Sequence, residues 1–317
     1  MIPVRNDAHG LRRCLDSISL NRRRSRAIEV IVVDNGSADE SVTVARERGA
    51  RVVERPGVSV AALRNLGAAL ARGETLAFVD ADHEIAEDWA DRVLDVLADP
   101  SVAATGAPYV APVQANWVQQ AYDHLRDHRP GQRDVRWLGS GNLVVRRAAF
   151  ERIGGFDASL ATCEDVDFCA RLLRGGQRIV SDSRIVNVHH GDPHSLADLF
   201  AGELWRGQDN LRVSFRGQLR LADGPAIAIP LILLLSFAAV LVAVVTWPSP
   251  GDRLALLGVL GILAVVALRV GRMRLRGAAV SLSRLTAVAA TFETARALAL
   301  MVRVRHRRAH AAQKSAA

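Results

Sequence analysis

Apolar runs of strand length alternate with helical patterns through the first hundred residues. Strands that alternate with helices predict an α/β fold with a mostly parallel sheet and right-handed crossovers. Ligands of such sheets bind at the carboxyl ends of the strands. Strands are expected over residues 28–33, 51–53 and 75–79, and helices over residues 39–48, 59–72 and 87–98.

The last third of the chain follows a different pattern. Residues 225–247 carry no charge, and at about 1.5 Å per residue they can cross a hydrocarbon layer about 30 Å thick. Residues 254–268 form a second, shorter apolar run, so a transmembrane helical hairpin is expected, with residues 248–252 as its turn. The alternative is a pair of buried core helices. A third apolar stretch, residues 278–302, has arginines on both flanks, which favours two spans over three.

These patterns divide the chain into a catalytic domain over residues 1–215, a transmembrane hairpin over residues 216–270 and a basic cytoplasmic or interfacial tail over residues 271–317. The net charge is +8, but the residues from Arg269 onward carry eleven Arg or Lys and one acid, a net of +10, which leaves −2 before them. Basic charge beside apolar segments indicates anionic membrane lipids as partners. Nucleic acid is not expected as a partner.

Cysteine usage and the first residues indicate the compartment. The three cysteines, Cys14, Cys163 and Cys169, have no close paired spacing, which fits a reducing compartment and no disulfide framework. No basic leader followed by an apolar run opens the chain, so no signal peptide is expected. Residues 2–4 are predicted to be the end of a first strand whose start lies upstream.

The sequence Asp80-Ala81-Asp82 follows the third predicted strand. Two carboxylates at the ligand edge of a parallel sheet can hold a hard divalent cation, Mg²⁺ or Mn²⁺, against a diphosphate. Taken alone, such a pair is more typical of a solvated turn, because Asp is favoured in turns.

Four further motifs occur in order along the chain. Asp34-Asn35-Gly36-Ser37 follows a strand, Arg64-Asn65-Leu66-Gly67 lies on a helix, and Gly139-Ser140-Gly141-Asn142 leads toward Glu164-Asp165-Val166-Asp167. Together with Asp80-Ala81-Asp82 they resemble glycosyltransferase family 2, inverting enzymes of the GT-A fold. The resemblance covers roughly residues 2–210.

The resemblance implies a role for each motif. The Glu164-Asp165 pair carries the catalytic base, which maps onto Asp165. Asp82 is the principal metal ligand, and either His189 or His190, after a last core strand over residues 179–188, completes the metal shell; His190 is taken as the ligand. Nucleotide-sugar contacts are implied for Pro3, Val4, Arg5, Asp34, Asn35, Arg64, Asp80 and Arg206.

Each of these residues also has a purely structural interpretation. Asp34 can serve as a turn residue, Arg64 as a surface charge and either histidine as an exposed loop residue. Asp165 and Glu164 can stabilise a helix start through the macrodipole. The aperiodic segment 108–137 either shapes an acceptor site or covers the core.

The function expected from the resemblance is metal-dependent transfer of a sugar from a nucleotide donor, of UDP or GDP type, to a hydroxyl of a glycan or lipid-linked acceptor, with inversion, in cell-surface glycan or glycolipid biosynthesis. The protein is expected at the inner or plasma membrane with its catalytic domain facing the cytoplasm. The segment Glu203-Leu204-Trp205-Arg206-Gly207 departs from the Gln-x-x-Arg-Trp pattern of processive members, so addition of a single sugar is expected.

Three alternatives remain at this point. In a polyprenyl-phosphate glycosyltransferase the acceptor is already an anion and needs no base. A non-catalytic, membrane-anchored protein would bind the nucleotide sugar without turnover. A nucleotidyltransferase is disfavoured, because no glycine-rich loop with a lysine lies near the first strand.

Overall fold

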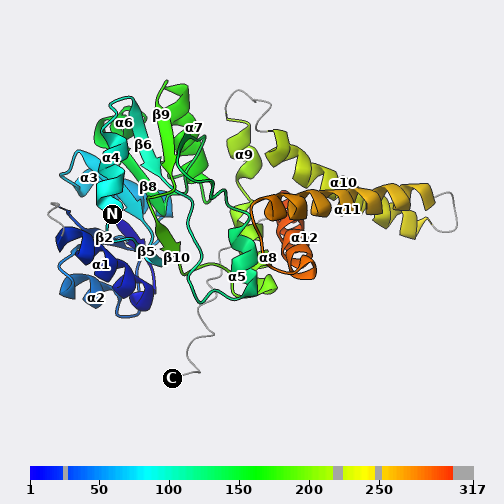
Figure 1. Cartoon of the computed structure of the whole chain (residues 1–317), viewed down its shortest axis with the longest axis horizontal. Coiled ribbons are helices and arrows are strands. Elements are labelled where there is room, and N and C mark those ends of the chain that lie inside the picture. The colour runs from blue at the N-terminus through cyan, green and yellow to red at the C-terminus, as the bar shows by residue number, and fades with distance from the viewer. Residues whose placement is uncertain (24–27, 217–223, 247–251, 303–317) are drawn as a thin grey trace. The chain divides into compact units, whose positions relative to one another are not determined.

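The computed structural model divides the chain into two compact units, which Figure 1 shows in chain colours. The first unit joins Met1–Gln114 to Arg126–Asp192, and the second joins Ala115–Leu125 to the residues from Pro193 onward. The structure describes residues 1–23, 28–216, 224–246 and 252–302.

The first unit is built of alternating strands and helices, as the apolar pattern predicts. Strand β4 (Thr75–Val79) has the predicted bounds, and helix α3 begins after Ser59, whose hydroxyl accepts a hydrogen bond from Ala62 N as an N-cap. The elements are β1 (Ile2–Val4), α1 (Ala8–Arg23), β2 (Ile31–Asp34), α2 (Ser41–Glu47), β3 (Arg51–Glu54), α3 (Val60–Leu70), β4, β5 (His83–Ile85), α4 (Trp89–Leu97), β6 (Val102–Gly106), β7 (Gln132–Asp134), β8 (Asn142–Arg146), α6 (Arg147–Arg152), α7 (Glu164–Arg174), β9 (Arg178–Asp182) and β10 (Asn187–His189).

The strands form three sheets. Strands β1, β2 and β3 pair in parallel, with Val4 beside Asp34. The five-stranded sheet, in the order β4-β8-β6-β9-β7, is mixed, because β8 runs antiparallel to both β4 and β6. The amino group of Met1 donates to Ala77 O at 2.8 Å, and Val79 N donates to Met1 O at 3.2 Å, which joins β4 to the start of β1.

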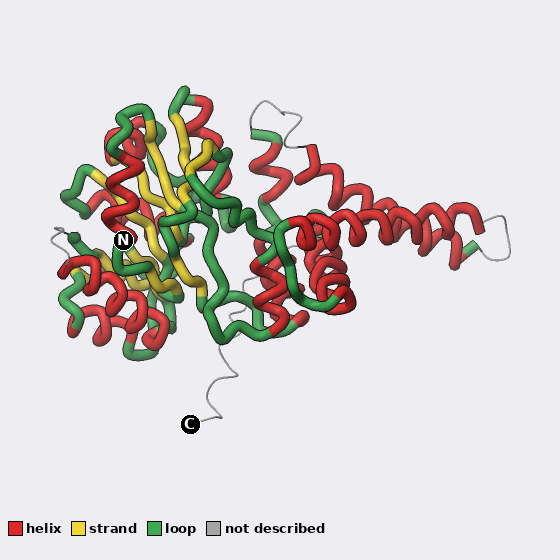
Figure 2. Tube along the Cα trace, in the orientation of Figure 1, coloured by secondary structure: helices red, strands yellow, loops and turns green. Residues whose placement is uncertain are grey.

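Helices cover both faces of these strands, which Figure 2 shows in yellow among red helices. Successive strand residues point to opposite faces, so Val79 packs with α1 and α4 while Phe78 packs with α6 and α7. Burial on both faces explains why these strands are apolar runs rather than alternating ones.

Two expectations about the first unit are corrected. The single strand expected over residues 179–188 is two strands, because β9 pairs with β6 whereas β10 pairs with β5 after a turn. The segment 108–137 is not irregular throughout. It contains β7 and, in the second unit, α5 (Trp117–Asp123), which starts with a capping box formed by Asn116 and Gln119.

The second unit is helical. Its core joins Val118 of α5, Leu199 of α8, Val270 of α11 and Leu285 of α12. The chain therefore enters this unit at Pro193, earlier than the expected boundary at residue 215, because α8 contributes to this core. Its helices are α5, α8 (Leu196–Arg206), α9 (Asn210–Ser214), α10 (Gly224–Val245), α11 (Asp252–Leu275) and α12 (Leu282–Leu298).

Two helices of this unit, Gly224–Val245 and Arg253–Leu275 within α11, are long and apolar enough to cross a membrane. Helix α11 is longer than the apolar run expected over residues 254–268. It continues past Arg269, because this guanidinium donates to Glu293 of α12 at 2.6 Å. Of the basic tail expected over residues 271–317, residues 271–275 form the end of α11 and residues 282–298 form α12, and residues 303–317 lie outside the described residues. Residues 248–251 of the expected turn lie outside the described residues.

Candidate active site

The ends of β1 and β2 form a cradle of hydrogen-bond acceptors. Asp34 is buried, and its Oδ2 accepts from Gly36 N and Ser37 N, both at 2.9 Å, in a tight turn. Asn35 N donates to Val4 O at 2.8 Å. The Oδ1 atoms of Asp34 and Asn35 are buried without a hydrogen-bond partner among the described residues. Buried acceptors without partners are costly, so this cradle is suited to a ligand that brings N–H or O–H donors.

The other predicted residues of the first strand lie in or next to this cradle. Pro3 is buried in β1, beside Val33 in the parallel register. Arg5 follows the strand and is exposed. Asn6 has a φ of 53° and accepts from Ala38 N at 2.6 Å, which ties the loop after β1 to the turn after β2.

Arg64 connects two carboxylates from distant parts of the chain. It is 3% exposed on α3, and its two terminal nitrogens donate to Asp80 Oδ1 and Glu164 Oε1, each at 2.6 Å. Its Nε is buried without a hydrogen-bond partner among the described residues. Arg64 is therefore not the surface charge of the structural interpretation. It fixes the strand end after β4 to the start of α7.

Asp165 stands beside this ion pair. Asp165 Oδ1 accepts from Val166 N at 2.8 Å and Oδ2 from Ser140 N at 3.4 Å. Burial and the neighbouring carboxylate of Glu164 raise the pKa of Asp165 to about 7, although the charge of Arg64 opposes the shift. Cys163, just before the helix, has a left-handed φ of 59°, a conformation that costs about 1–3 kcal/mol and is concentrated at functional sites.

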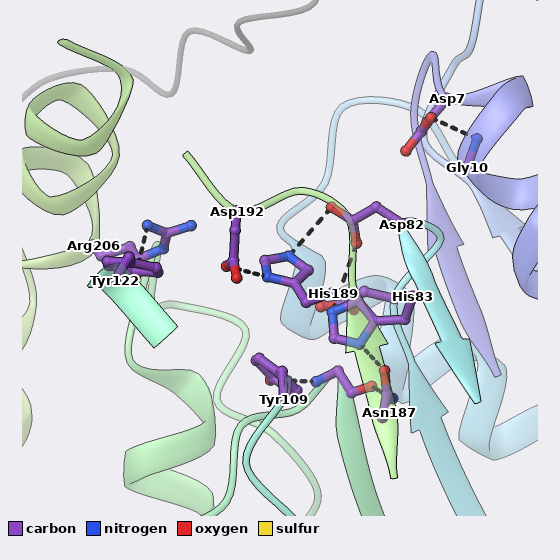
Figure 3. A network of polar contacts seen from close by, with 12 residues as sticks. Asp7, Gly10, Asp82, His83, Tyr109, Tyr122, Asn187, His189, Asp192 and Arg206 are labelled. Carbon is purple, nitrogen blue, oxygen red and sulfur yellow. Dashed lines mark hydrogen bonds and ion pairs between the residues drawn. The ribbon is translucent and has the colours of Figure 1, made fainter. Parts of the chain in front are cut away.

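Asp82 lies in a second cluster, with two histidines (Figure 3). His189 Nε2 is 3.5 Å from Asp82 Oδ2, and His83 Nε2 is 3.7 Å from Asp82 Oδ1. One ligand atom from each of the three residues lies within 4.8 Å of the others. His83 and His189 face each other because they are directly paired in the register of β5 and β10.

Each histidine of this cluster is held from behind through its Nδ1. His83 Nδ1 lies 2.7 Å from Asn187 Oδ1, and His189 Nδ1 lies 2.6 Å from Asp192 Oδ1. Arg126 forms a two-pronged ion pair with Asp192 and lies over the Tyr109 ring. Such partners on the far ring nitrogen are typical of metal-binding histidines.

The pKa values of Asp82, His83 and His189 are shifted in different directions. Burial alone would raise the pKa of Asp82, but His189 and His83 hold it well below its usual range. Burial and the charge of His189 lower the pKa of His83 to about 4. Burial works against a charged His189, but Asp192 and Asp82 outweigh it and raise its pKa to about 9. A cation that binds here must displace the proton of His189; an ionised carboxylate and two neutral imidazole rings are then a donor set that fits a divalent cation.

The choice of His190 as the metal-site histidine was wrong. Its Nε2 lies 2.9 Å from Glu84 Oε2, and it is His189 that faces Asp82. His189 is the last residue of β10 and is paired with His83, whereas His190 lies in the turn after the strand, where its backbone N donates to Asp82 O at 3.0 Å. Nothing in the local sequence distinguishes the two adjacent histidines.

Arg206 belongs to the second unit. Its guanidinium donates to Glu203 Oε1 at 2.9 Å and to the Tyr122 hydroxyl at 3.4 Å. Glu203 is buried and also lies 3.8 Å from Arg296. The structure therefore gives Arg206 a partner within α8, and a diphosphate contact stays a prediction.

Sequence reasoning did not single out His83, Asn187 or Arg126. His83 directly follows Asp82, so its position was available as a signal, but its partner Asn187 lies 104 residues away. Arg126 is similarly 66 residues from Asp192. These pairs depend on the pairing of β5 with β10 and on the loop before β7.

Fold comparison defines the class. A solved structure of the mannosyltransferase PcManGT from Pyrobaculum calidifontis, in complex with GDP-Man and Mn²⁺, has a TM-score of 0.64 at 20% identity and covers 92% of this chain and 85% of that one. GalNAc-T7 with UDP, GalNAc and Mn²⁺ has a TM-score of 0.50 at 17% identity, over 64% of this chain and 47% of that one. The first unit has the GT-A fold.

Sequence comparison gives a family match over part of the chain. Residues 1–154 match the model of glycosyl transferase family 2, which supports a family 2 glycosyltransferase. It is 32% identical over 220 residues to the pre-mycofactocin glycosyltransferase of Mycobacterium tuberculosis, which covers 65% of this chain and 45% of that protein. It is 24% identical over 241 residues to glycosyltransferase AglE of Haloferax volcanii, over 72% and 78% of the two chains. The chain thus spans less than half the length of the mycobacterial relative.

Proposed function

We propose that this protein transfers a sugar from a nucleoside diphosphate sugar to an acceptor hydroxyl with inversion of the anomeric centre. The observation that carries the proposal is that the carboxylates of Asp82 and Asp165 have different surroundings. Asp82 is ionised and faces two imidazoles, whereas Asp165 has a pKa raised to about 7. One carboxylate is suited to a cation and the other to a proton.

The donor nucleotide would lie over the cradle formed by the ends of β1 and β2. The partnerless Oδ1 atoms of Asp34 and Asn35 would accept hydrogen bonds from the base or the ribose. Asp80 Oδ1 is held by Arg64, which would orient its other oxygen toward the ribose or toward water. The two similar structures contain GDP-Man and UDP, so both GDP- and UDP-type donors are compatible with this fold.

Asp82 and His189 would hold a divalent cation, Mg²⁺ or Mn²⁺, which would neutralise the charge that develops on the diphosphate leaving group. Ordering of this pair is supported by the contacts behind it. Asp192 and Arg126 fix the His189 ring, so its Nε2 is presented to Asp82 before any ligand binds. Preorganisation of this kind lowers the cost of binding.

Asp165 would accept the proton of the acceptor hydroxyl. A base works best when its pKa lies near the working pH, and burial beside Glu164 sets this pKa. Attack from the side opposite the leaving group would invert the anomeric centre. Glu164, engaged by Arg64, would position the helix start rather than take the proton.

The helices α10 and α11 support a membrane anchor. Large apolar side chains on them are exposed, among them Leu235, Val244, Leu257 and Leu263. We place the first unit on the cytoplasmic side of the inner or plasma membrane, where anionic lipid would attract the arginines from Arg269 onward. The acceptor would be a glycan or a lipid-linked molecule in cell-surface glycan or glycolipid biosynthesis, extended by one sugar.

A panel of nucleotide sugars tests this function. Purified full chain in detergent or lipid would be incubated with UDP- and GDP-sugars, a divalent cation and a membrane extract as the acceptor source, and release of the nucleoside diphosphate would be measured. One donor should give acceptor-dependent release that stops in excess chelator. Release of pyrophosphate, or nucleotide binding without any release, would contradict the proposal.

A further inference from the structure

His83 is a buried histidine that the proposed chemistry does not yet use. It is 1% exposed, at the start of the short strand β5, and its Nε2 points toward Asp82 (Figure 3). The separation of 3.7 Å from Asp82 Oδ1 is too long for a hydrogen bond. The ring edge also faces the Tyr109 ring, at 4.6 Å between centroids.

The hydrogen-bond network assigns the protons of this ring. Asn187 Nδ2 donates to Gly141 O at 2.9 Å, so Asn187 must present its Oδ1, an acceptor, to His83. His83 Nδ1 therefore carries the hydrogen, and in the neutral ring Nε2 has a free lone pair. That lone pair faces the carboxylate of Asp82.

Two acceptors that face each other repel unless a donor or a cation lies between them. His189 also presents its Nε2 to Asp82, from the opposite strand: its Nδ1 is 2.6 Å from Asp192 Oδ1, and its Nε2 lies 3.5 Å from the other oxygen of Asp82. Three ligand atoms lie within 4.8 Å of one another, two of them nitrogens fixed by partners on the far side of the ring, and such a group could hold a metal ion.

We propose that His83 is a third protein ligand of the divalent cation, beside Asp82 and His189, and that the resulting pair of imidazole nitrogens makes the site select Mn²⁺ over Mg²⁺. The inference rests on the proposed cation site. Mg²⁺ binds oxygen ligands and retains its waters, whereas first-row transition ions accept imidazole readily. An all-oxygen site would have no such preference.

Pulsed EPR of Mn²⁺ bound to the full chain, labelled with ¹⁵N-histidine, tests the ligand set. The measurement would use Mn²⁺ alone and Mn²⁺ with UDP or GDP. Two directly coordinated histidine nitrogens are expected in the unmutated protein, and one in His83→Gln. A single nitrogen in the unmutated protein overturns the inference without any need for a variant to fold.

Metal titration tests the selectivity. In His83→Gln an amide oxygen replaces the nitrogen, so the Kd for Mn²⁺ should rise at least about tenfold, as for lost ligand support at other metal sites, while the Kd for Mg²⁺ changes little. The matched control is His190→Gln, since His190 contacts Glu84 and should leave both constants unchanged. Circular dichroism and thermal melting would verify that each variant is folded.

The outcomes separate this inference from the proposed site itself. Asp82→Asn should weaken the binding of both Mn²⁺ and Mg²⁺. If Asp82→Asn binds both ions normally, the cation site is elsewhere and the proposed function loses its metal. Asp82→Asn could instead lose cation binding while folded His83→Gln keeps the same preference for Mn²⁺ over Mg²⁺ as the unmutated protein. That result would support the cation site and contradict the role of His83.

Discussion

Glu164 and Asp165 are consecutive residues at the start of α7, yet Arg64 donates a hydrogen bond to Glu164 and none to Asp165 among the described contacts. The ion pair holds the Glu164 carboxylate next to Asp165. Burial, and then the charge of Glu164, raise the pKa of Asp165 to about 7. The two neighbouring carboxylates therefore differ: Glu164 is held in an ion pair, and Asp165 has a pKa suited to the proton transfer that we propose for it.

The pH dependence of transfer follows from this shift. Asp165 accepts a proton only when ionised, so kcat/KM should rise about tenfold per pH unit below pH 7 and level off above it. Initial rates between pH 5.5 and 8.5 at saturating cation would measure this. A rate that stays constant across that range would mean that the raised pKa is not expressed in catalysis.

Removal of Arg64 should affect both stability and this pH profile. Arg64→Met leaves Asp80 and Glu164 without their buried partner, which should cost about 3–5 kcal/mol of the free energy of unfolding. Because the charge of Arg64 lowers the pKa of Asp165, the midpoint of the pH profile should also move to higher pH. Denaturation and pH–rate curves would measure the two effects.

The control for this prediction is Arg72→Met. Arg72 pairs with Glu29 but is 85% exposed, and exposed pairs contribute only about 0–1 kcal/mol. If Arg64→Met were as mild as Arg72→Met in both measurements, Arg64 would not be the connection between β4 and α7.

Gly191 should be intolerant of a side chain. A Cβ atom there would lie 2.1 Å from Asp82 Oδ2, so Gly191→Ala must displace the Asp82 carboxylate. We expect loss of divalent-cation binding in a protein with nearly normal thermal stability, measured by Mn²⁺ titration and melting. Gly73→Ala is the control, because its nearest contact would be an ordinary 3.4 Å. Normal Mn²⁺ affinity in Gly191→Ala would show that Asp82 is not the ligand.

The apolar pattern predicted β4, α3 and the two long apolar helices. A strand that is buried on both faces is a short apolar run, and a membrane-spanning helix is a long run with few charges, so both can be recognised from neighbouring residues alone. Asp80, Asp82 and Asp165 could be named as candidate site residues for a similar reason, since they follow strands or begin a helix. His83 and the choice of His189 over His190 could not. They depend on the register between β5 and β10, which pairs residues more than 100 positions apart.

The end of α11, the second helix of the expected hairpin, also could not be predicted from the local sequence. Arg269 suggested that the second apolar helix stops there, but Glu293 of α12 accepts its hydrogen bond and the Phe292 ring lies 5.1 Å from its guanidinium carbon. A buried ion pair partner 24 residues away allows the helix to continue to Leu275. The charge of Arg269 therefore belongs to a contact between two helices and does not end α11.

Membrane orientation can be tested with single cysteines in a background without native cysteines. Thr246 directly follows α10, at the hairpin end, and Glu151 is exposed in the first unit. On intact cells an impermeant thiol reagent should label Thr246→Cys and leave Glu151→Cys unlabelled until the membrane is permeabilised. Labelling of Glu151→Cys alone would place the first unit outside the cell.

In the proposed function Asp165 takes the proton of an acceptor hydroxyl, and the kinetics of the Asp165→Asn variant measure this role. The amide keeps the shape but cannot accept the proton, so kcat should fall about 10²- to 10⁴-fold, while the Kd of the donor stays nearly unchanged. Glu164→Gln is the matched control and should cost far less in kcat. Normal turnover by Asp165→Asn would contradict the account, and an acceptor that is already an anion, such as a polyprenyl phosphate, would then explain the activity.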